Sequence, residues 1–293
     1  MPAQETSTNT IAHEKQIIQD VIGANSIEGI LLNDAGWDSR VYEVERHDYF
    51  FKFPRSNKIR RRYVFELAAL KLASTLTSGV RTPEPLWIGK NYAYFGYEGV
   101  KGETLGSVLP SLTDSQKHII GEHIGHFLRL LHDSKLDGAR EVSPESESAQ
   151  IQRWYNENQT GIAKLFEPQK LAKLEKLVYH TWPRQLAILG SDSVLCHGDF
   201  HFENILYDAG QGVGVIDFGD VAYYDRSKDF LELDDDPIVY QSALQAYGYT
   251  PKDFEEKIAL RQNMIQIINL GFYLGKQNHS GIQKTTEKIL LFL

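Results

Sequence analysis

Short apolar runs, each followed by glycine or a polar residue, succeed one another between residues 193 and 220. The runs cover residues 193–196, 205–207 and 213–216. Runs of this length between Gly, Asp and Asn residues are typical of buried strands joined by tight connections. The pattern therefore predicts three strands, with a turn over residues 208–212 between the second and the third.

Apolar and polar residues also alternate in the first hundred positions, where the pattern predicts a sheet and two helices. Ser56 or Asn57 can cap the second helix, which carries Ile59, Tyr63 and Leu70 on one face. The expected helices cover residues 10–22 and 57–74, and the expected strands cover residues 27–32, 41–44, 49–54, 86–89 and 92–97, with a turn at 33–39.

Helical patterns dominate the remainder of the chain. One helix is expected to begin at Thr113 or Asp114, interrupted helices are expected over residues 151–182, and the last helices follow residue 251. Residues 141–150 are polar and predict a loop. A strand-rich first third and a mostly helical remainder indicate an α+β protein.

The composition excludes several classes of function. The chain has 293 residues, a formal net charge of −8 and one cysteine, Cys196. Nothing supplies a broad basic face for nucleic acid, and no run approaches about 18 consecutive apolar residues, so neither nucleic acid nor a membrane is an expected partner. One cysteine forms no intramolecular disulfide and no apolar leader follows Met1, so we expect the reducing cytoplasm as the compartment. We also expect a monomer.

Three side chains with the chemistry of phosphoryl transfer lie between these strands. Asp199 follows the first strand, Asn204 comes five positions later, and Asp217 comes thirteen positions after Asn204. A carboxylate in a loop can take the proton of a hydroxyl, and amide and carboxylate oxygens suit Mg²⁺. Kinase chemistry requires a base together with metal ligands. The spacing therefore predicts Asp199 as the catalytic residue and Asn204 and Asp217 as metal ligands.

The stretch VLCHGDFHFENILYDAGQGVGVIDFGD, residues 194–220, resembles the aminoglycoside phosphotransferase family. Its HGD triplet stands where protein kinases carry H-R-D, and the spacing to Asn204 is the same. The motif IDFGD, followed by Asp225 and Asp229, looks most like the 2''-aminoglycoside phosphotransferases, and macrolide kinases share much of it.

This resemblance implies a protein-kinase-like fold of two lobes. Residues 1–98 would form a nucleotide-binding lobe, and residues 99–293 would carry the catalytic loop, the metal site and the acceptor pocket. The implied cofactor is Mg²⁺, with ATP or GTP as phosphoryl donor. Lys52 is the one charged residue of an apolar strand and needs an anionic partner or must lose its charge, unless the strand lies at an edge and the lysine faces water. Glu66, the lone acid on the apolar face of the next helix, is the partner that we expect.

The resemblance also suggests how nucleotide would bind. The C=O of Glu98 and the N–H of Val100 would contact the base at the hinge between the lobes. Ser39, together with backbone amides near Gly36, would cover the phosphates. These four residues complete the predicted nucleotide site with Lys52.

For the acceptor, we expect Asp220, Asp235 and Asp236 to receive the protonated amines of a polycationic, hydroxylated small molecule. Asp229 is expected to be a structural carboxylate. An equal alternative for the acidic run at residues 232–236 is a helix N-terminus decorated by acids that complement its dipole.

The leading hypothesis is therefore an O-phosphotransferase that moves the γ-phosphate of a nucleoside triphosphate to a hydroxyl of an aminoglycoside antibiotic and so confers resistance. The alternative is a kinase of the same fold for a macrolide, a choline-like alcohol or another hydroxylated metabolite. A non-catalytic pseudokinase is a third possibility, against which the intact Asp199, Asn204 and Asp217 argue. A protein kinase is disfavoured because G-x-G-x-x-G is absent and the HGD triplet lacks Arg.

Overall fold

The alternating residues of the N-terminal third form a five-stranded antiparallel sheet with the strand order β1-β2-β3-β5-β4. The computed structural model describes residues 7–23, 29–34, 36, 38–44 and 48–293, so residues 27 and 28 of the first expected strand, and Ala35 and Trp37 of the turn, lie outside the described residues. The strands are β1 (Ile30–Asn33), β2 (Ser39–Val44), β3 (Tyr49–Pro54), β4 (Pro85–Ile88) and β5 (Phe95–Glu98).

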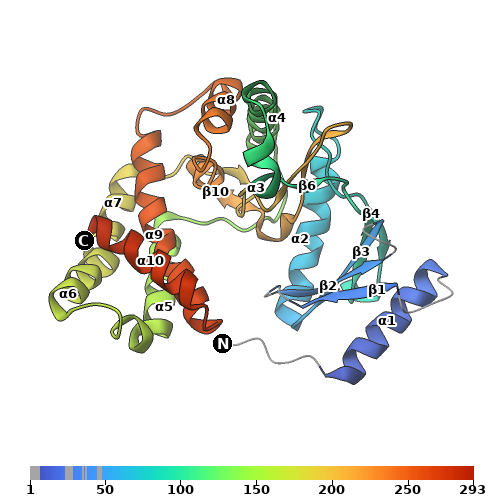
Figure 1. Ribbon diagram of the computed structural model, residues 1–293, viewed down its shortest axis with the longest axis horizontal. Coiled ribbons are helices and arrows are strands. Elements are labelled where there is room, and N and C mark those ends of the chain that lie inside the picture. The colour runs from blue at the N-terminus through green and yellow to red at the C-terminus, as the bar shows by residue number, and fades with distance from the viewer. Residues whose placement is uncertain (1–6, 24–28, 35, 37, 45–47) are drawn as a thin grey trace.

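The two predicted N-terminal helices cover opposite faces of this sheet (Figure 1). Helix α1 (Thr8–Ile22) packs Ile18 into an apolar cluster with Tyr42 and Phe51 of the sheet. Helix α2 (Asn57–Ala73) begins where the Ser56 hydroxyl accepts a hydrogen bond from a backbone amide of the first turn, as expected for a cap. It packs on the other face, where the Tyr63 ring meets the Phe95 ring edge-on at 4.8 Å.

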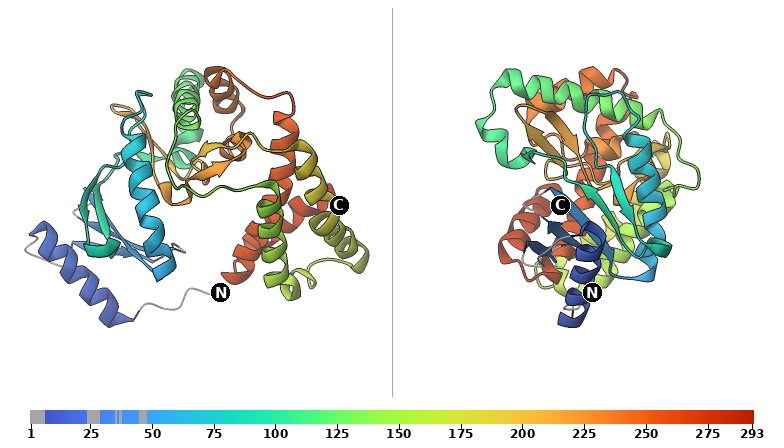
Figure 2. Two further views of the ribbon diagram at one scale, coloured as in Figure 1. Left: turned by 180° about the vertical axis from the view of Figure 1, so that it is seen from behind. Right: turned by 90° about the vertical axis from the view of Figure 1, so that its right-hand side faces the viewer.

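Most of the helices follow the N-terminal sheet in the chain. They gather on the side away from the N-terminal sheet (Figure 2). The helices are α3 (Leu105–Val108), α4 (Asp114–His132), α5 (Pro144–Ile162), α6 (Pro168–Lys176), α7 (Trp182–Leu189), α8 (Pro237–Tyr247), α9 (Phe254–Gly275) and α10 (His279–Phe292). The predicted α+β architecture of two lobes is thereby confirmed. No helix in the described part of the chain is long and apolar enough to span a membrane.

Two buried apolar clusters hold the helical part together. One joins α2 and α4 to the strands of the catalytic region and to α8, and the other lies among α5, α6, α7, α9 and α10. Helices α4 and α8 approach closely because α4 has glycine at the contact. A Cβ added to Gly125 would lie 2.2 Å from the carbonyl oxygen of Ala243, so no larger residue fits without separating the two helices.

Two small sheets carry the predicted catalytic residues. One has the strand order β6-β8-β9, from Glu103–Thr104, Ile205–Asp208 and Gly212–Val215, and the other pairs β7 (Val194–Cys196) with β10 (Ala222–Tyr224). The three strands predicted between residues 193 and 216 are therefore confirmed. The turn after β8 is closed by Asp208, whose Oδ1 accepts hydrogen bonds from the backbone N–H of Gly210 and of Gln211 at 2.8 Å.

Two sequence predictions of secondary structure are wrong. Residues 141–150 are not a loop, because α5 begins at Pro144 with Ser143 as its N-cap and acidic residues in its first turn. The strand expected over residues 92–97 begins only at Phe95. Asn91 and Tyr92 have φ angles of 54° and 57°, which belong to a turn and not to a strand.

Candidate active site

The catalytic loop leaves β7 and is held by a buried carboxylate. The Asp229 side chain accepts hydrogen bonds from the backbone N–H of His197 at 2.7 Å and of Gly198 at 2.8 Å, and it contacts His132 Nε2 of α4 at 3.1 Å. Gly198 has a φ of 87°, and an added Cβ would lie 2.4 Å from the carbonyl oxygen of Asp220, so the turn requires glycine. Asp229 therefore has the structural role expected of it, and it fixes the loop that presents Asp199.

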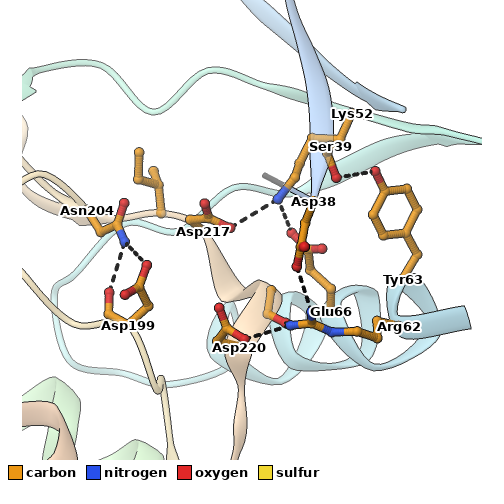
Figure 3. Close-up of polar contacts among 12 residues, drawn as sticks. Asp38, Ser39, Lys52, Arg62, Tyr63, Glu66, Asp199, Asn204, Asp217 and Asp220 are labelled. Carbon is orange, nitrogen blue, oxygen red and sulfur yellow. Dashed lines mark hydrogen bonds and ion pairs between the residues drawn. The ribbon is translucent and has the colours of Figure 1, made fainter. Parts of the chain in front are cut away.

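Asp199 and Asn204 are joined within this loop (Figure 3). The amide nitrogen of Asn204 donates to Asp199 Oδ2 at 3.1 Å and to the Asp199 carbonyl at 2.9 Å. About half of the Asp199 side chain, 48%, remains exposed. Because the Asn204 nitrogen faces Asp199, its amide oxygen is directed elsewhere and stays available for a cation.

Asp217 lies beside Asn204 because a backbone hydrogen bond connects the two segments. The N–H of Ile216 donates to the Asn204 carbonyl at 3.0 Å, at the point where β8 begins and β9 ends. Half of the Asp217 side chain, 50%, is exposed. An amide oxygen and a half-exposed carboxylate on adjacent segments are hard ligands that fit Mg²⁺.

Lys52 enters the site from the centre of the N-terminal sheet. Its Nζ lies 2.5 Å from Glu66 Oε1 of α2 and 3.1 Å from Asp217 Oδ1 (Figure 3). Burial disfavours the ammonium, but Asp217 and Glu66 hold the pKa of Lys52 well above its ordinary value. The charge of Lys52 in turn lowers the pKa of Asp217. The predicted pairing of Lys52 with Glu66 is present, and it reaches the metal ligand as well.

Arg62, one turn before Glu66 on α2, makes a second bridge. Its guanidinium lies 2.6 Å from Asp38 Oδ2, 2.6 Å from Asp220 Oδ1 and 2.5 Å from the Gly219 carbonyl (Figure 3). The Asp220 carboxylate, predicted to bind acceptor amines, is thus used in an ion pair with an arginine. Arg62 was not singled out from the sequence, where it is one of three successive arginines.

A cavity of about 930 Å³ opens beside Asp199 and Asp220. Its walls include His201, Lys228 and Glu232, which sequence reasoning did not single out as site residues. His201 Nε2 lies 3.5 Å from Asp199 Oδ2. Burial raises the pKa of Asp199, yet His201, and then Lys228, bring it well below its ordinary value, so the carboxylate is ionised. The volume suits a ligand of several hundred daltons.

The predicted acceptor contacts of Asp235 and Asp236 are not supported. Asp236 is 7% exposed, caps α8 by accepting from the backbone N–H of Ile238 and Val239, and pairs with Lys117 at 2.7 Å. Asp235 is exposed, and neither residue is part of the cavity wall. The alternative, acids at a helix N-terminus, is therefore the correct interpretation of Asp236.

The predicted nucleotide contacts lie on the interior strands β2 and β5 of the N-terminal sheet and just after β5. Ser39 is 5% exposed and its hydroxyl bonds to the Tyr63 hydroxyl at 2.7 Å, which corrects the expectation that this hydroxyl covers phosphates. Glu98 ends β5 and is exposed. The N–H of Val100 has no hydrogen-bond partner among the described residues. The contacts of Glu98 and Val100 with the base stay predictions.

Comparison with known proteins gives relatives of one kind. A sequence model described as the phosphotransferase enzyme family matches residues 29–252. An aminoglycoside 3'-phosphotransferase of Escherichia coli is 26% identical over 190 residues, and the alignment covers 62% of this chain and 66% of that protein, just under two thirds of its length. A further aminoglycoside 3'-phosphotransferase from Escherichia coli is 23% identical over 250 residues, covering 80% of this chain and 84% of the relative.

Solved structures share the fold over nearly the full length. The GDP and kanamycin complex of an APH(2'') enzyme superposes with a TM-score of 0.74 at 19% identity, covering 94% of this chain and 97% of the other. A type I macrolide 2'-phosphotransferase gives a TM-score of 0.65 at 17% identity, covering 97% and 98%. At these identities the structures establish the fold, while the family match covers most of the chain. This chain therefore belongs to the phosphotransferase enzyme family.

Proposed function

We propose that this protein is an O-phosphotransferase that moves the γ-phosphoryl group of a nucleoside triphosphate to a hydroxyl of a small molecule, with aminoglycosides as the first acceptor class to test. The observation that carries the proposal is the convergence of Asp199, Asn204, Asp217 and Lys52 on one point of the cleft. Family membership gives the reaction class, and the names of the relatives give the acceptor class.

Each residue has a distinct part in the proposed reaction. Asp199 orients the acceptor hydroxyl and receives its proton, late in the reaction because the transition state of phosphoryl transfer is loose. Asn204 and Asp217 would hold Mg²⁺, which, when bound, neutralises charge on the phosphates. Lys52 adds a fixed positive charge. Two carboxylates at about 4 Å repel by roughly 4 kcal/mol at an effective dielectric constant near 20, so the cationic groups also permit Asp199 and Asp217 to stay ionised together.

The donor would be ATP or GTP, with its base at the end of β5. We place the boundary between the lobes at residues 98 and 99, since β5 ends at Glu98 and β6 already pairs with β8 of the other lobe. Glu98 and Val100 would bind the base there. We further propose a monomer that acts in the cytoplasm, where nucleoside triphosphates are available.

A second acceptor class is favoured by the cavity itself. Of the three acids that the sequence predicted to attract a polycation, Asp235 and Asp236 lie outside the cavity wall and Asp220 is paired with an arginine. A hydroxylated metabolite with fewer positive charges fits this arrangement better than a polycation does. A macrolide remains a further alternative, since a macrolide phosphotransferase shares the fold.

A coupled assay for nucleoside diphosphate tests the proposal. Wild-type protein is given MgATP or MgGTP with kanamycin, erythromycin, choline or a sugar acid, and the Asp199→Asn variant is measured beside it. We expect acceptor-dependent diphosphate release that requires Mg²⁺ and falls by a factor of at least a thousand in the variant, because a positioned base contributes about 10² to 10⁴ and the Asp199–Asn204 contact is altered too. A folded wild-type protein without metal-dependent turnover on any acceptor would instead indicate a pseudokinase.

A further inference from the structure

The acceptor cavity is not an acidic pocket. Six cationic and six acidic side chains line it, with its histidine counted as neutral. Ion pairs within the protein use two of these cations and three of these acids: Arg62 pairs with Asp220, Arg261 with Glu147, and Glu66 with Lys52. Four cations and three carboxylates are left to face a ligand. Among the lining side chains the two signs are equal in number, so the cavity has no acidic surplus that would favour a polycation.

Lys228 is the cation best placed to meet that group. It adjoins Asp229, whose carboxylate holds the catalytic loop, and Ser227, whose hydroxyl bonds Asp225 Oδ1 at 2.7 Å. The backbone on both sides of Lys228 is therefore anchored by buried contacts, and the side chain lies in the cavity wall. Among the described residues (7–23, 29–34, 36, 38–44 and 48–293), its ammonium has no hydrogen-bond or ion-pair partner. Burial lowers the pKa of Lys228, but Tyr224 and the carboxylates of Asp199 and Glu232 raise it above its ordinary value, so the ammonium stays charged and its donors can bind a ligand.

Arg140 and Tyr224 provide further donors on the same wall. The Arg140 guanidinium donates to the Tyr224 hydroxyl at 2.7 Å and lies over the Tyr224 ring, 5.7 Å from its centroid. Because that hydroxyl accepts from Arg140, its own proton is free to be donated. The backbone fixes this arrangement, since the N–H of Tyr223 donates to the Arg140 carbonyl at 2.8 Å. Burial raises the pKa of the Tyr224 hydroxyl, and the charges of Arg140 and Lys228 both act to lower it.

We propose that Lys228, Arg140 and the Tyr224 hydroxyl form an anion subsite in the acceptor cavity, and that the preferred acceptor is a hydroxylated molecule bearing a carboxylate. An ammonium, a guanidinium and a phenol supply donors for both carboxylate oxygens. Asp199 lines the same cavity, so a molecule bound there by its carboxylate shares the cavity with the base. This inference rests on the proposed phosphotransferase function.

Binding of a matched pair of probes tests the subsite without turnover. D-glucuronate and D-glucuronamide differ only in one group, which is a charged carboxylate in the first and a neutral amide in the second. Isothermal titration calorimetry in saturating MgADP gives the dissociation constant of each. We expect wild-type protein to bind glucuronate at least tenfold more tightly than glucuronamide. The Lys228→Met variant should lose most of that preference, Lys228→Arg should keep it, and Lys288→Met, an exposed lysine on α10, should leave it unchanged.

Equal binding of the two probes to wild-type protein, or an unchanged preference in folded Lys228→Met, would overturn the subsite. Because Lys228 makes no hydrogen bond or ion pair within the described part of the chain, the variant should fold, which circular dichroism checks; should it fail to fold, Arg140→Met takes its place. The proposed function fails separately. If the charge preference holds but no acceptor yields diphosphate release that Asp199→Asn removes, phosphoryl transfer is wrong and the anion subsite stands.

Discussion

Replacing Glu66 by glutamine tests whether the Lys52 ammonium is positioned by its two carboxylates. Glu66 is 5% exposed, and its Oε1 lies 2.5 Å from Lys52 Nζ, compared with 3.1 Å for Asp217 Oδ1. A glutamine of the same shape keeps an oxygen acceptor but removes one charge. Hydrogen bonds to charged groups contribute about 1.5 to 3 kcal/mol, so we expect a loss of about 2 kcal/mol, which lowers Tm by roughly 4 to 8 °C.

The kinetic consequence is more specific than the loss of stability. Without Glu66, the ammonium of Lys52 is attracted by Asp217 alone, where it competes with the metal. Steady-state kinetics should show kcat/KM for nucleotide reduced about tenfold to thirtyfold, since 1.4 kcal/mol corresponds to a factor of ten. The Mg²⁺ concentration for half-maximal activity should rise, and added Mg²⁺ should recover part of the rate.

The matched control is Glu84→Gln, an exposed glutamate outside the cavity wall, which should behave as wild type in both measurements. A merely structural role of Glu66 would lower Tm without moving the Mg²⁺ dependence. The reasoning is refuted if folded Glu66→Gln has kcat/KM within twofold of wild type and the same half-maximal Mg²⁺ concentration.

Three further predictions follow from the same contacts. Asp217→Asn should lower kcat by at least a hundredfold and reduce the stimulation of turnover by Mg²⁺, which the diphosphate assay measures. Its Tm, measured by thermal shift, should change little because half of the Asp217 side chain is exposed. Asp225→Asn should cost about 3 kcal/mol at pH 7, because the ammonium of Lys257 loses a fully buried carboxylate at 2.9 Å and keeps only Asp253, at 3.4 Å, as a charge partner. Burial raises the pKa of Asp225, but Arg261 and Lys257 bring it below its ordinary value, so its contribution to stability is present above about pH 4 and is lost as the pH falls. Urea unfolding at pH 7 and pH 3 should show that the difference in unfolding free energy between wild type and variant shrinks in acid. A difference that does not depend on pH would contradict this. Asp236→Ala should lower the unfolding free energy by about 1 kcal/mol through loss of the cap and leave kcat/KM for acceptors unchanged, whereas a selective loss of acceptor use would return Asp236 to the binding site.

Sequence reasoning succeeded where the signal is local or where a buried charge requires a partner. Ser56 before an amphipathic run locates α2, and β3 matches the predicted residues 49–54. The pairing of Lys52 with Glu66 could be predicted because each is a lone charge among apolar residues of its element. The start of α5 was within reach, since Ser143, a proline at the first helical position and acids in the first turn are helix-start signals. The polar composition of residues 141–150 was given too much weight.

The acceptor side could not be predicted in this way, because its chemistry depends on contacts between distant segments. Asp236 is adjacent to Asp235 in sequence, but Lys117, its ion-pair partner, lies 119 positions away. The Tyr224 hydroxyl meets Arg140 over a separation of 84 positions. Neither pair leaves a pattern in the sequence. A run of acids therefore has the same composition whether it faces a cavity or caps a helix.

Net charge is a poor guide to the ligand of this site for a physical reason. Charges in water at physiological salt are screened beyond about 8 Å, so most of the acids behind the value of −8 contribute little to the potential in the cleft. A bound ligand interacts with the charges near it. Among these, Lys52 and Arg62 are offset by carboxylate partners, whereas Lys228 has no ion-pair partner among the described residues. An acidic protein can therefore hold a polyphosphate on one side of Asp199 and a carboxylate on the other. The charge of the acceptor has to be inferred from the pairing inside the cavity.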